Sequence, residues 1–144
     1  MKRTLTIMAL VTCMCACEEM ALDGAWDPME LDKTHLNFPQ EGGEQAVVVL
    51  NYSSWWISGA YSGIDKTDGR WEYLDYIHPT SSGGDETCTY DILDGGWYQV
   101  TVPDISRSNR AIFKVSPNGT GARREAIIDM TAGDVFTSIS ISQD

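Results

Sequence analysis

Five aromatic residues are the side chains of this sequence best suited to binding a ligand. They are Trp56, Tyr61, Trp71, Tyr73 and Trp97. A sugar ring presents apolar C–H faces, so an exposed flat aromatic ring can stack on it while neighbouring polar side chains bond its hydroxyls. These residue types therefore predict a stacking surface of the kind that binds carbohydrate.

The outward direction of two of these tryptophans follows from the alternation of side chains along a strand. Successive side chains of a β-strand point to opposite faces, so Trp56 faces outward if Trp55 and Ile57 are buried. The same alternation turns Trp97 away from the face that begins with Tyr98. An alternative is that Trp71 and Tyr73 cover one of these tryptophans in a packed cluster, because large aromatic side chains are more often packed than displayed.

No set of residues has the spacing of a catalytic or metal centre. Eight acidic residues lie between positions 62 and 96: Asp65, Asp68, Glu72, Asp75, Asp85, Glu86, Asp91 and Asp94. Their spacing matches no calcium loop, and no two of them are marked as a pair for glycoside hydrolysis. His35 and His78 have no ligand spacing, and Cys88 has no nearby histidine to activate its thiol. We expect a non-catalytic protein without a metal or cofactor.

The segments that would position the aromatic residues are predicted to be β-strands. Seven segments have the alternation or the β-branched composition of strands: 36–38, 46–50, 55–58, 97–102, 110–115, 125–130 and 135–142. Segment 46–50 is expected to be buried on both faces. About seven short strands separated by Gly, Pro and Asn predict an all-β fold, an immunoglobulin-like antiparallel β-sandwich.

The sandwich is predicted to span residues 31–144, with an insertion at 62–96. The insertion holds many glycines together with Trp71, Tyr73 and Tyr76. A long insertion in a compact domain is either functional or mobile, and its aromatic residues predict that it is partly folded against the sandwich. Residues 17–30 are too polar and broken to pack and are predicted to be a flexible tether.

The first residues resemble the signal peptide of a bacterial lipoprotein. Lys2 and Arg3 precede a short apolar run, and Ala16 stands directly before Cys17. The resemblance implies that residues 1–16 are removed and that Cys17 is acylated, so the chain would be attached to the outer membrane by lipid. Glu18-Glu19 resembles the export signal of surface lipoproteins in the Bacteroidetes, which favours the cell surface over the periplasmic face.

The charge of the chain excludes some partners. It carries 21 acidic and 10 basic residues, a formal net charge of −11 at pH 7. Nucleic acid and anionic lipid both require a basic surface, so neither is an expected partner of the folded domain. The membrane would be reached through the lipid alone.

Two groups of motifs together resemble a BACON domain. The first is Phe38, Glu41-Gly-Gly, the valine-rich segment that ends at Asn51, Trp55 and Ile57; the second is Arg124-Glu-Ala-Ile-Ile, Gly133-Asp134 and Ile139-Ser-Ile-Ser-Gln143. The resemblance covers residues 31–143. It implies an immunoglobulin-like sandwich in the cell envelope of the Bacteroidetes and a role in binding carbohydrate or mucin. The alternative is a structural spacer or an assembly subunit of a surface complex.

Overall fold

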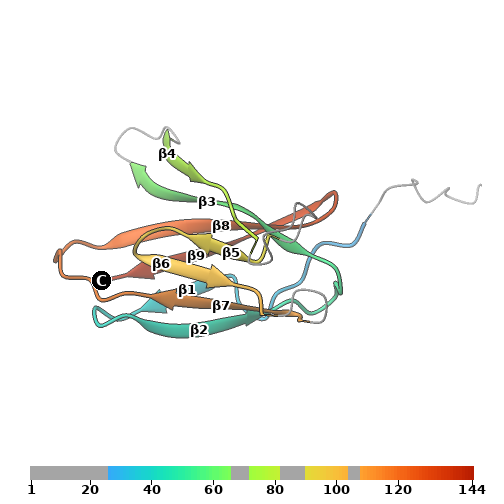
Figure 1. Cartoon of the computed structure of the whole chain (residues 1–144), viewed down its shortest axis with the longest axis horizontal. Helices are drawn as coiled ribbons and strands as arrows, with labels where there is room; N and C mark the ends of the chain where they lie inside the picture. Colours follow the sequence, from blue (N-terminus) through green and yellow to red (C-terminus); the bar gives the residue numbers. More distant parts are fainter. Residues whose placement is uncertain (1–25, 66–71, 82–89, 104–107) are drawn as a thin grey trace, which may run out of the picture.

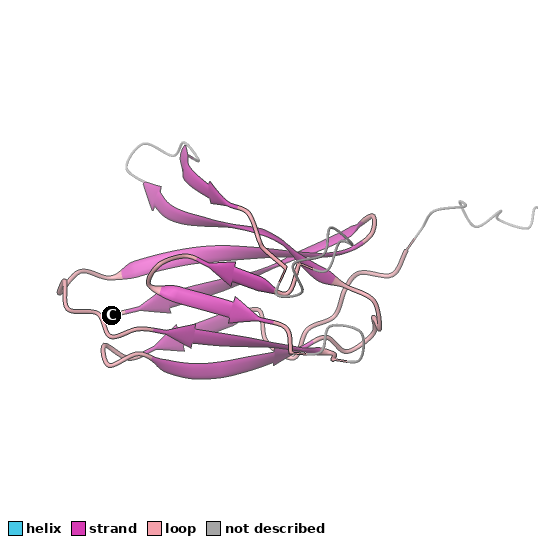
Figure 2. Ribbon diagram, viewed as in Figure 1, coloured by secondary structure: helices cyan, strands magenta, loops and turns pink. Residues whose placement is uncertain are grey.

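The chain forms strands and turns without a helix in the part that is described (Figure 2). The computed structural model describes residues 26–65, 72–81, 90–103 and 108–144, and it leaves out the side chains of residues 62–65 and 72–75. Nine strands lie in these residues: β1 (His35–Phe38), β2 (Gly43–Val48), β3 (Trp56–Asp65), β4 (Glu72–Ile77), β5 (Ile92–Asp94), β6 (Tyr98–Thr101), β7 (Arg110–Val115), β8 (Arg124–Ala132) and β9 (Val135–Gln143).

The strands form two sheets that pack face to face. One sheet has five strands in the order β1-β9-β8-β3-β4, and the other has four in the order β2-β7-β6-β5 (Figure 1). All pairs are antiparallel except β1 and β9, which run parallel. The predicted all-β sandwich is therefore confirmed.

The predicted insertion contains the strands that the sequence analysis did not anticipate. All seven predicted segments coincide with strands, while β4 and β5 lie within residues 62–96. Strand β3 also continues to Asp65, and its last residues pair with β4 from Glu72 onward. The resulting β3–β4 hairpin projects beyond the other strands at the upper left of Figure 1.

The core lies between the two sheets and is formed by alternate residues of nearly every strand. Its buried hydrophobic residues are Met29, Leu36, Phe38, Val47, Val49, Trp55, Ile57, Ala60, Leu93, Tyr98, Val100, Val102, Ala111, Phe113, Val115, Ala126, Ile128, Met130, Ile139 and Ile141. Trp55 and Ile57 are both buried and Trp56 is half-buried, so the predicted alternation in this segment is confirmed.

The expectation that segment 46–50 is buried on both faces is wrong. Val47 and Val49 are buried, but Ala46 and Val48 are half-buried and Leu50 is 59% exposed. Strand β2 ends at Val48 and lies at the edge of the four-stranded sheet. Only one face of that sheet meets the other sheet, so a strand within it has a single buried face.

Packing begins inside the segment predicted as a tether. Met29 is 6% exposed and belongs to the core. The backbone around it is held by the chain that follows β2: Asn51 donates from Nδ2 to the carbonyl of Pro28 at 2.7 Å, and the Tyr52 hydroxyl donates to the carbonyl of Asp27. The folded domain therefore starts before residue 31.

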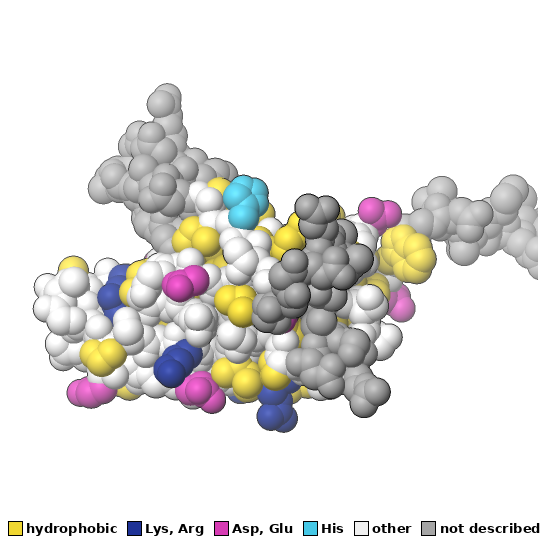
Figure 3. Space-filling model, in the orientation of Figure 1, with side chains coloured by type: hydrophobic (Ala, Val, Ile, Leu, Met, Phe, Trp, Pro, Cys, Tyr) yellow, Lys and Arg dark blue, Asp and Glu magenta, His cyan; other side chains and the backbone are white. Residues whose placement is uncertain are grey.

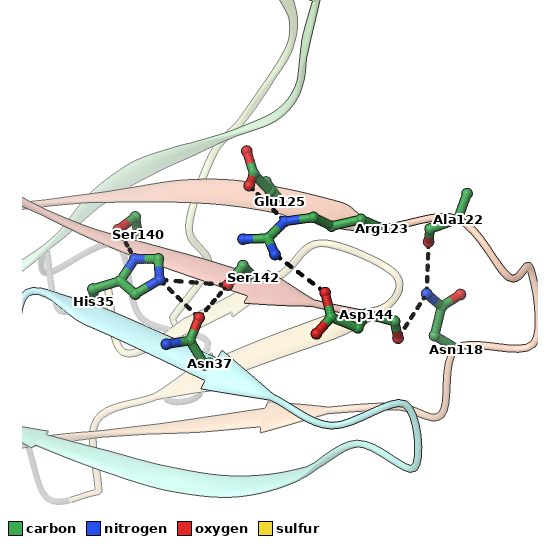
Figure 4. A network of polar contacts seen from close by, with 9 residues as sticks. All are labelled: His35, Asn37, Asn118, Ala122, Arg123, Glu125, Ser140, Ser142 and Asp144. Atoms are coloured by element: carbon green, nitrogen blue, oxygen red, sulfur yellow. Dashed lines mark hydrogen bonds and ion pairs between the residues drawn. The ribbon is translucent and has the colours of Figure 1, made fainter.

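A row of polar side chains holds β1 to β9 on the outer face of the five-stranded sheet (Figure 4). His35 Nδ1 lies 2.5 Å from the Ser140 hydroxyl, and His35 Nε2 lies 2.9 Å from Asn37 Oδ1. The Ser142 hydroxyl donates to the same Asn37 oxygen at 2.6 Å. These bonds supplement the backbone pairing of β1, which has four residues.

Candidate functional site

A β-bulge in β3 brings Trp56 and Tyr61 to the outer face of the five-stranded sheet. The register of β3 with β8 shifts between Ile57 and Gly59. Ile57 and Ala60 are consequently both buried, although they are three residues apart and would alternate in a regular strand. Trp56 and Tyr61 flank these two core residues and are half-buried on the opposite face.

Strand β4 and the chain beyond it add further rings to this face. We call the set the aromatic patch, and it consists of Trp56, Tyr61, Tyr76, His78 and Tyr90. Tyr76 lies at its middle, with its ring centroid 5.0 Å from that of Tyr61 and 4.6 Å from that of His78, both in edge-to-face geometry. Tyr76 and Tyr90 are 41% and 42% exposed. The patch is therefore packed within itself and still reached by solvent.

The position of the Tyr76 ring depends on a glycine in the bulge. A Cβ atom at Gly59 would lie 2.1 Å from the Tyr76 hydroxyl oxygen and 2.3 Å from Cζ of its ring. The hydroxyl donates to the carbonyl of Ser58 at 2.8 Å. Glycine in a strand often marks such a close approach, and here it lets the hydroxyl end of the ring come close to the backbone of β3.

A hollow opens beside the ring of His78. It has a volume of about 380 Å³ and is lined by Trp56, Ser58, His78, Pro79 and Tyr90. This volume is within the usual range of small-molecule sites, and the lining combines flat rings with hydroxyl and imidazole groups. In the space-filling view, hydrophobic side chains lie around a histidine near the end of β4 (Figure 3).

Acidic and hydroxyl groups continue the surface across β8 and β9. Asp129 pairs with Gly59 in the register of the sheet, and its carboxylate accepts a hydrogen bond from Ser138 at 2.7 Å. Burial raises the pKa of Tyr76 above the ordinary 10.0, and the negative charge of Asp129 raises the pKa further. Tyr76 is therefore held as a neutral hydrogen-bonding group beside a carboxylate that can accept bonds from sugar hydroxyls.

The predicted stacking residues do not all lie at this surface. Trp56 and Tyr61 belong to the aromatic patch. Trp71 lies outside the described residues, as does the side chain of Tyr73, whose backbone pairs with Ile64 in the β3–β4 hairpin. The proposed lipid site Cys17 is also outside the described residues.

Trp97 lies away from the aromatic patch. It is half-buried against the core, and its ring is 4.8 Å from that of Tyr98. The Arg124 guanidinium lies over the Trp97 ring at 4.6 Å from the centroid, so that this side of the ring is not open for stacking. A second hollow of about 400 Å³ adjoins Trp97 and is lined in part by Asp94, Gln99 and Lys114.

Tyr76, His78 and Tyr90 were not among the predicted ligand-binding residues. Tyr76 and His78 are two positions apart, which places them on one face of a strand, but the sequence analysis treated this segment as an irregular insertion. A prediction of strand β4 from Glu72-Tyr-Leu-Asp-Tyr-Ile77 would have revealed that alternation. Tyr90 had no such signal, because only the tertiary structure brings it beside Trp56.

In residues 26–65, 72–81, 90–103 and 108–144, no group of three or more His, Cys, Asp or Glu side chains is arranged to hold a metal ion. The same residues contain no helix long and apolar enough to cross a membrane.

Comparison with known proteins gives a structural relative and no family. No protein-family model matches the chain, and no curated protein matches it. The chain is similar to the NMR structure of a protein from Bacteroides thetaiotaomicron, with 28% sequence identity and a TM-score of 0.60 over 89% of this chain and 96% of that one. The similarity supports the β-sandwich and is compatible with a protein of the Bacteroidetes, while the resemblance to a BACON domain stays a prediction.

Proposed function

We propose that this protein is a non-catalytic, lipid-anchored protein of the cell envelope that binds carbohydrate through the aromatic patch. The observation that carries the proposal is the gathering of Trp56, His78 and Tyr90 around one hollow, with the Tyr76 ring packed against that of His78. Partly exposed rings beside a carboxylate and hydroxyls have the chemistry that a sugar requires, with apolar faces for its C–H groups and polar atoms for its hydroxyls.

The proposed cellular location of the protein is supported by its sequence and by its structural relative. The leader that ends at Cys17 supports acylation and attachment to the outer membrane, on the cell surface rather than its periplasmic face. The similarity to a Bacteroides thetaiotaomicron protein is compatible with a source in the Bacteroidetes, and the envelope setting is what the resemblance to a BACON domain implies. Attachment to a membrane would raise the local concentration of a binding site that is weak by itself.

Binding to immobilised glycans tests the proposal. The fragment should comprise residues 18–144, because a fragment that starts at Leu31 would lack the core residue Met29. Trp56→Ala and Tyr76→Ala should each weaken retention about fivefold to tenfold, since an aromatic contact contributes about 1 kcal/mol or more. Tyr76→Phe keeps the ring and should keep most of the retention.

The matched control is Leu50→Ala, because Leu50 is 59% exposed and does not belong to the aromatic patch. It should leave retention unchanged. An absence of retention by the unaltered fragment across host and plant polysaccharides would contradict carbohydrate binding and favour the spacer or assembly role.

A further inference from the structure

The large hydrophobic side chains that remain exposed fall into two groups. Within the described part of the chain they are Trp26, Leu50, Tyr76, Tyr90 and Phe136. Tyr76 and Tyr90 belong to the aromatic patch. The other three are the most exposed of the five, at 66%, 59% and 71% for Trp26, Leu50 and Phe136. Exposed apolar side chains that gather in one place usually mark a contact surface.

Trp26, Leu50 and Phe136 lie at one end of the sandwich, which we call the N-terminal end. Leu50 donates its backbone N–H to the carbonyl of Glu30 at 2.9 Å, so the chain that follows Trp26 lies against the chain that follows β2. Because β1 runs parallel to β9, the chain enters β1 from the end at which β9 begins, and Phe136 is the second residue of β9. Figure 1 shows the β8–β9 turn and the segment after residue 26 at the same right-hand end.

The chain toward Cys17 leaves from this same end. Eight residues lie between Cys17 and Trp26, a span of about 30 Å at most when fully extended. A lipid on Cys17 would therefore keep the N-terminal end closer to the bilayer than any other part of the domain. Tryptophan is enriched at the membrane–water interface, where its ring is buried among headgroups while its N–H remains hydrated.

From these observations we propose that the N-terminal end docks on the bilayer surface through Trp26, Leu50 and Phe136. This inference rests on the proposed lipid anchor and adds an orientation to it. The acidic residues Asp27 and Asp134 are exposed near the three apolar side chains, so the surface that is contacted should be neutral rather than anionic. In this orientation the end of β3 and the start of β4, which project beyond the other strands, lie away from the membrane (Figure 1).

Fluorescence quenching by spin-labelled lipid headgroups tests the docking. The mature acylated chain carries Cys88→Ser and a single labelled cysteine, either Asp134→Cys at the N-terminal end or Gly119→Cys at the opposite end. Gly119 is exposed and has open space around it for a side chain. In phosphatidylcholine vesicles the label at position 134 should be quenched several-fold more than the label at position 119. Trp26→Ser combined with Phe136→Ser should remove most of that difference.

Two controls separate the contact from the anchor. Pro117→Ser removes an exposed apolar side chain at the opposite end, in the loop that holds Gly119, and should leave the quenching unchanged. Adding phosphatidylglycerol should weaken the quenching at position 134, whereas flotation with the vesicles should persist in every variant.

Each failure has a distinct meaning. A chain that does not float with vesicles has no lipid, which contradicts the proposed anchor and the docking together. A chain that floats with equal quenching at both positions contradicts the docking and leaves the anchor standing. The label at position 134 could instead be shielded from the quencher to an extent that depends on the amount of protein per vesicle. That result would mean that a second copy of the chain covers this end, and it would overturn the inference. Carbohydrate retention is measured separately and is affected by none of these results.

Discussion

At the scale of the residue, Gln143 shows how one buried polar side chain joins the two sheets. It is 1% exposed, and its Nε2 donates to the carbonyls of Pro39 at 2.9 Å and Ser116 at 3.0 Å. Its Oε1 accepts a bond from Nε of Arg124 at 2.8 Å. The side chain thus bonds to carbonyl groups of both the β1–β2 turn and the chain after β7, and its own buried polar atoms are satisfied by these bonds.

Gln143→Ala should lower the free energy of unfolding by about 2–4 kcal/mol, because it removes these hydrogen bonds between the two sheets and creates a cavity. Denaturant unfolding followed by circular dichroism measures the change. Gln99→Ala is the control, since Gln99 is exposed on β6, and it should change stability by about 0.5 kcal/mol or less. Equal effects of the two substitutions would contradict the structural role of Gln143.

Tyr76 predicts a dependence of stability on alkaline pH. Burial, and secondly the charge of Asp129, raises its pKa in the folded protein above the ordinary 10.0. The folded state therefore holds the phenol proton more tightly than the unfolded state does, so the stability from this group is present below the unfolded pKa and is lost as pH rises through the folded pKa. Above about pH 10 the unaltered protein should lose stability more steeply than Tyr76→Phe.

Denaturant midpoints across the alkaline range measure this difference. Asp129→Asn should make the loss smaller, because it removes the second cause of the raised pKa. If Tyr76→Phe follows the unaltered protein at every pH, the coupling of Tyr76 ionisation to folding does not exist.

At the scale of the element, the turn between β1 and β2 links the two sheets. Among the described turns that have a glycine at positive φ, it leaves the least space for a Cβ atom at that glycine. Gly42 has a φ of 77°, and its N–H donates to the carbonyl of Pro39 at 2.9 Å. A Cβ at this position would lie 2.2 Å from the backbone oxygen of Val115 in β7. Gly133 in the β8–β9 turn has a similar φ of 75° but open space around it.

Alanine substitution at these two glycines distinguishes the cost of backbone strain from the cost of steric overlap. Gly133→Ala should cost about 1 kcal/mol, the strain of a left-handed conformation alone. Gly42→Ala should cost about 2–4 kcal/mol, because the backbone of β7 must also move. Thermal or denaturant unfolding of both variants measures the comparison, and a Gly133→Ala variant as unstable as Gly42→Ala would refute it.

At the scale of the whole molecule, the domain is closed by chain that precedes its first strand. Met29 fills part of the core, and the backbone of Asp27 and Pro28 is bonded to Tyr52 and Asn51. The N–H of Glu30 bonds to the Asn51 side chain at 2.8 Å. Because the same segment leads to Cys17, the proposed lipid anchor would be joined to the domain by a short link at the end where the docking is proposed.

A fragment of residues 31–144 should therefore be less stable than one of residues 26–144, by about 2–5 kcal/mol, the usual cost of removing a buried methionine side chain. Met29→Ala in the longer fragment should reproduce most of the loss. Denaturant unfolding of the three proteins decides the matter, and equal midpoints would mean that residues 26–30 do not contribute to the fold.

Much of the fold could be predicted from local patterns, because strand alternation is recorded in neighbouring residues. Ala126, Ile128 and Met130 are buried as their alternation predicts, and the same holds for Ala111, Phe113 and Val115. Strands β4 and β5 were missed because glycine-rich flanks and many polar residues surround them. In strands this short, the alternation of polar and apolar residues is too brief to be recognised among the surrounding polar residues and glycines.

The site was predictable only in part. The direction of Trp56 followed from its neighbours Trp55 and Ile57, and the structure agrees. The bulge that brings Tyr61 to the same face is a property of the pairing between β3 and β8, and no residue type by itself specifies it. The contact of Arg124 with Trp97 likewise joins residues 27 positions apart.

By itself the sequence determined the strand composition, the buried face of most strands and the leader that predicts acylation of Cys17. These features depend on residues that are adjacent in the chain. The tertiary structure alone decided that His78 and Tyr90 lie beside Trp56 at one hollow, with Tyr76 packed against His78, and that Trp26, Leu50 and Phe136 share one end. Such contacts depend on the register of hydrogen bonds between strands and on the packing of the two sheets, which bring together residues that are far apart in the chain.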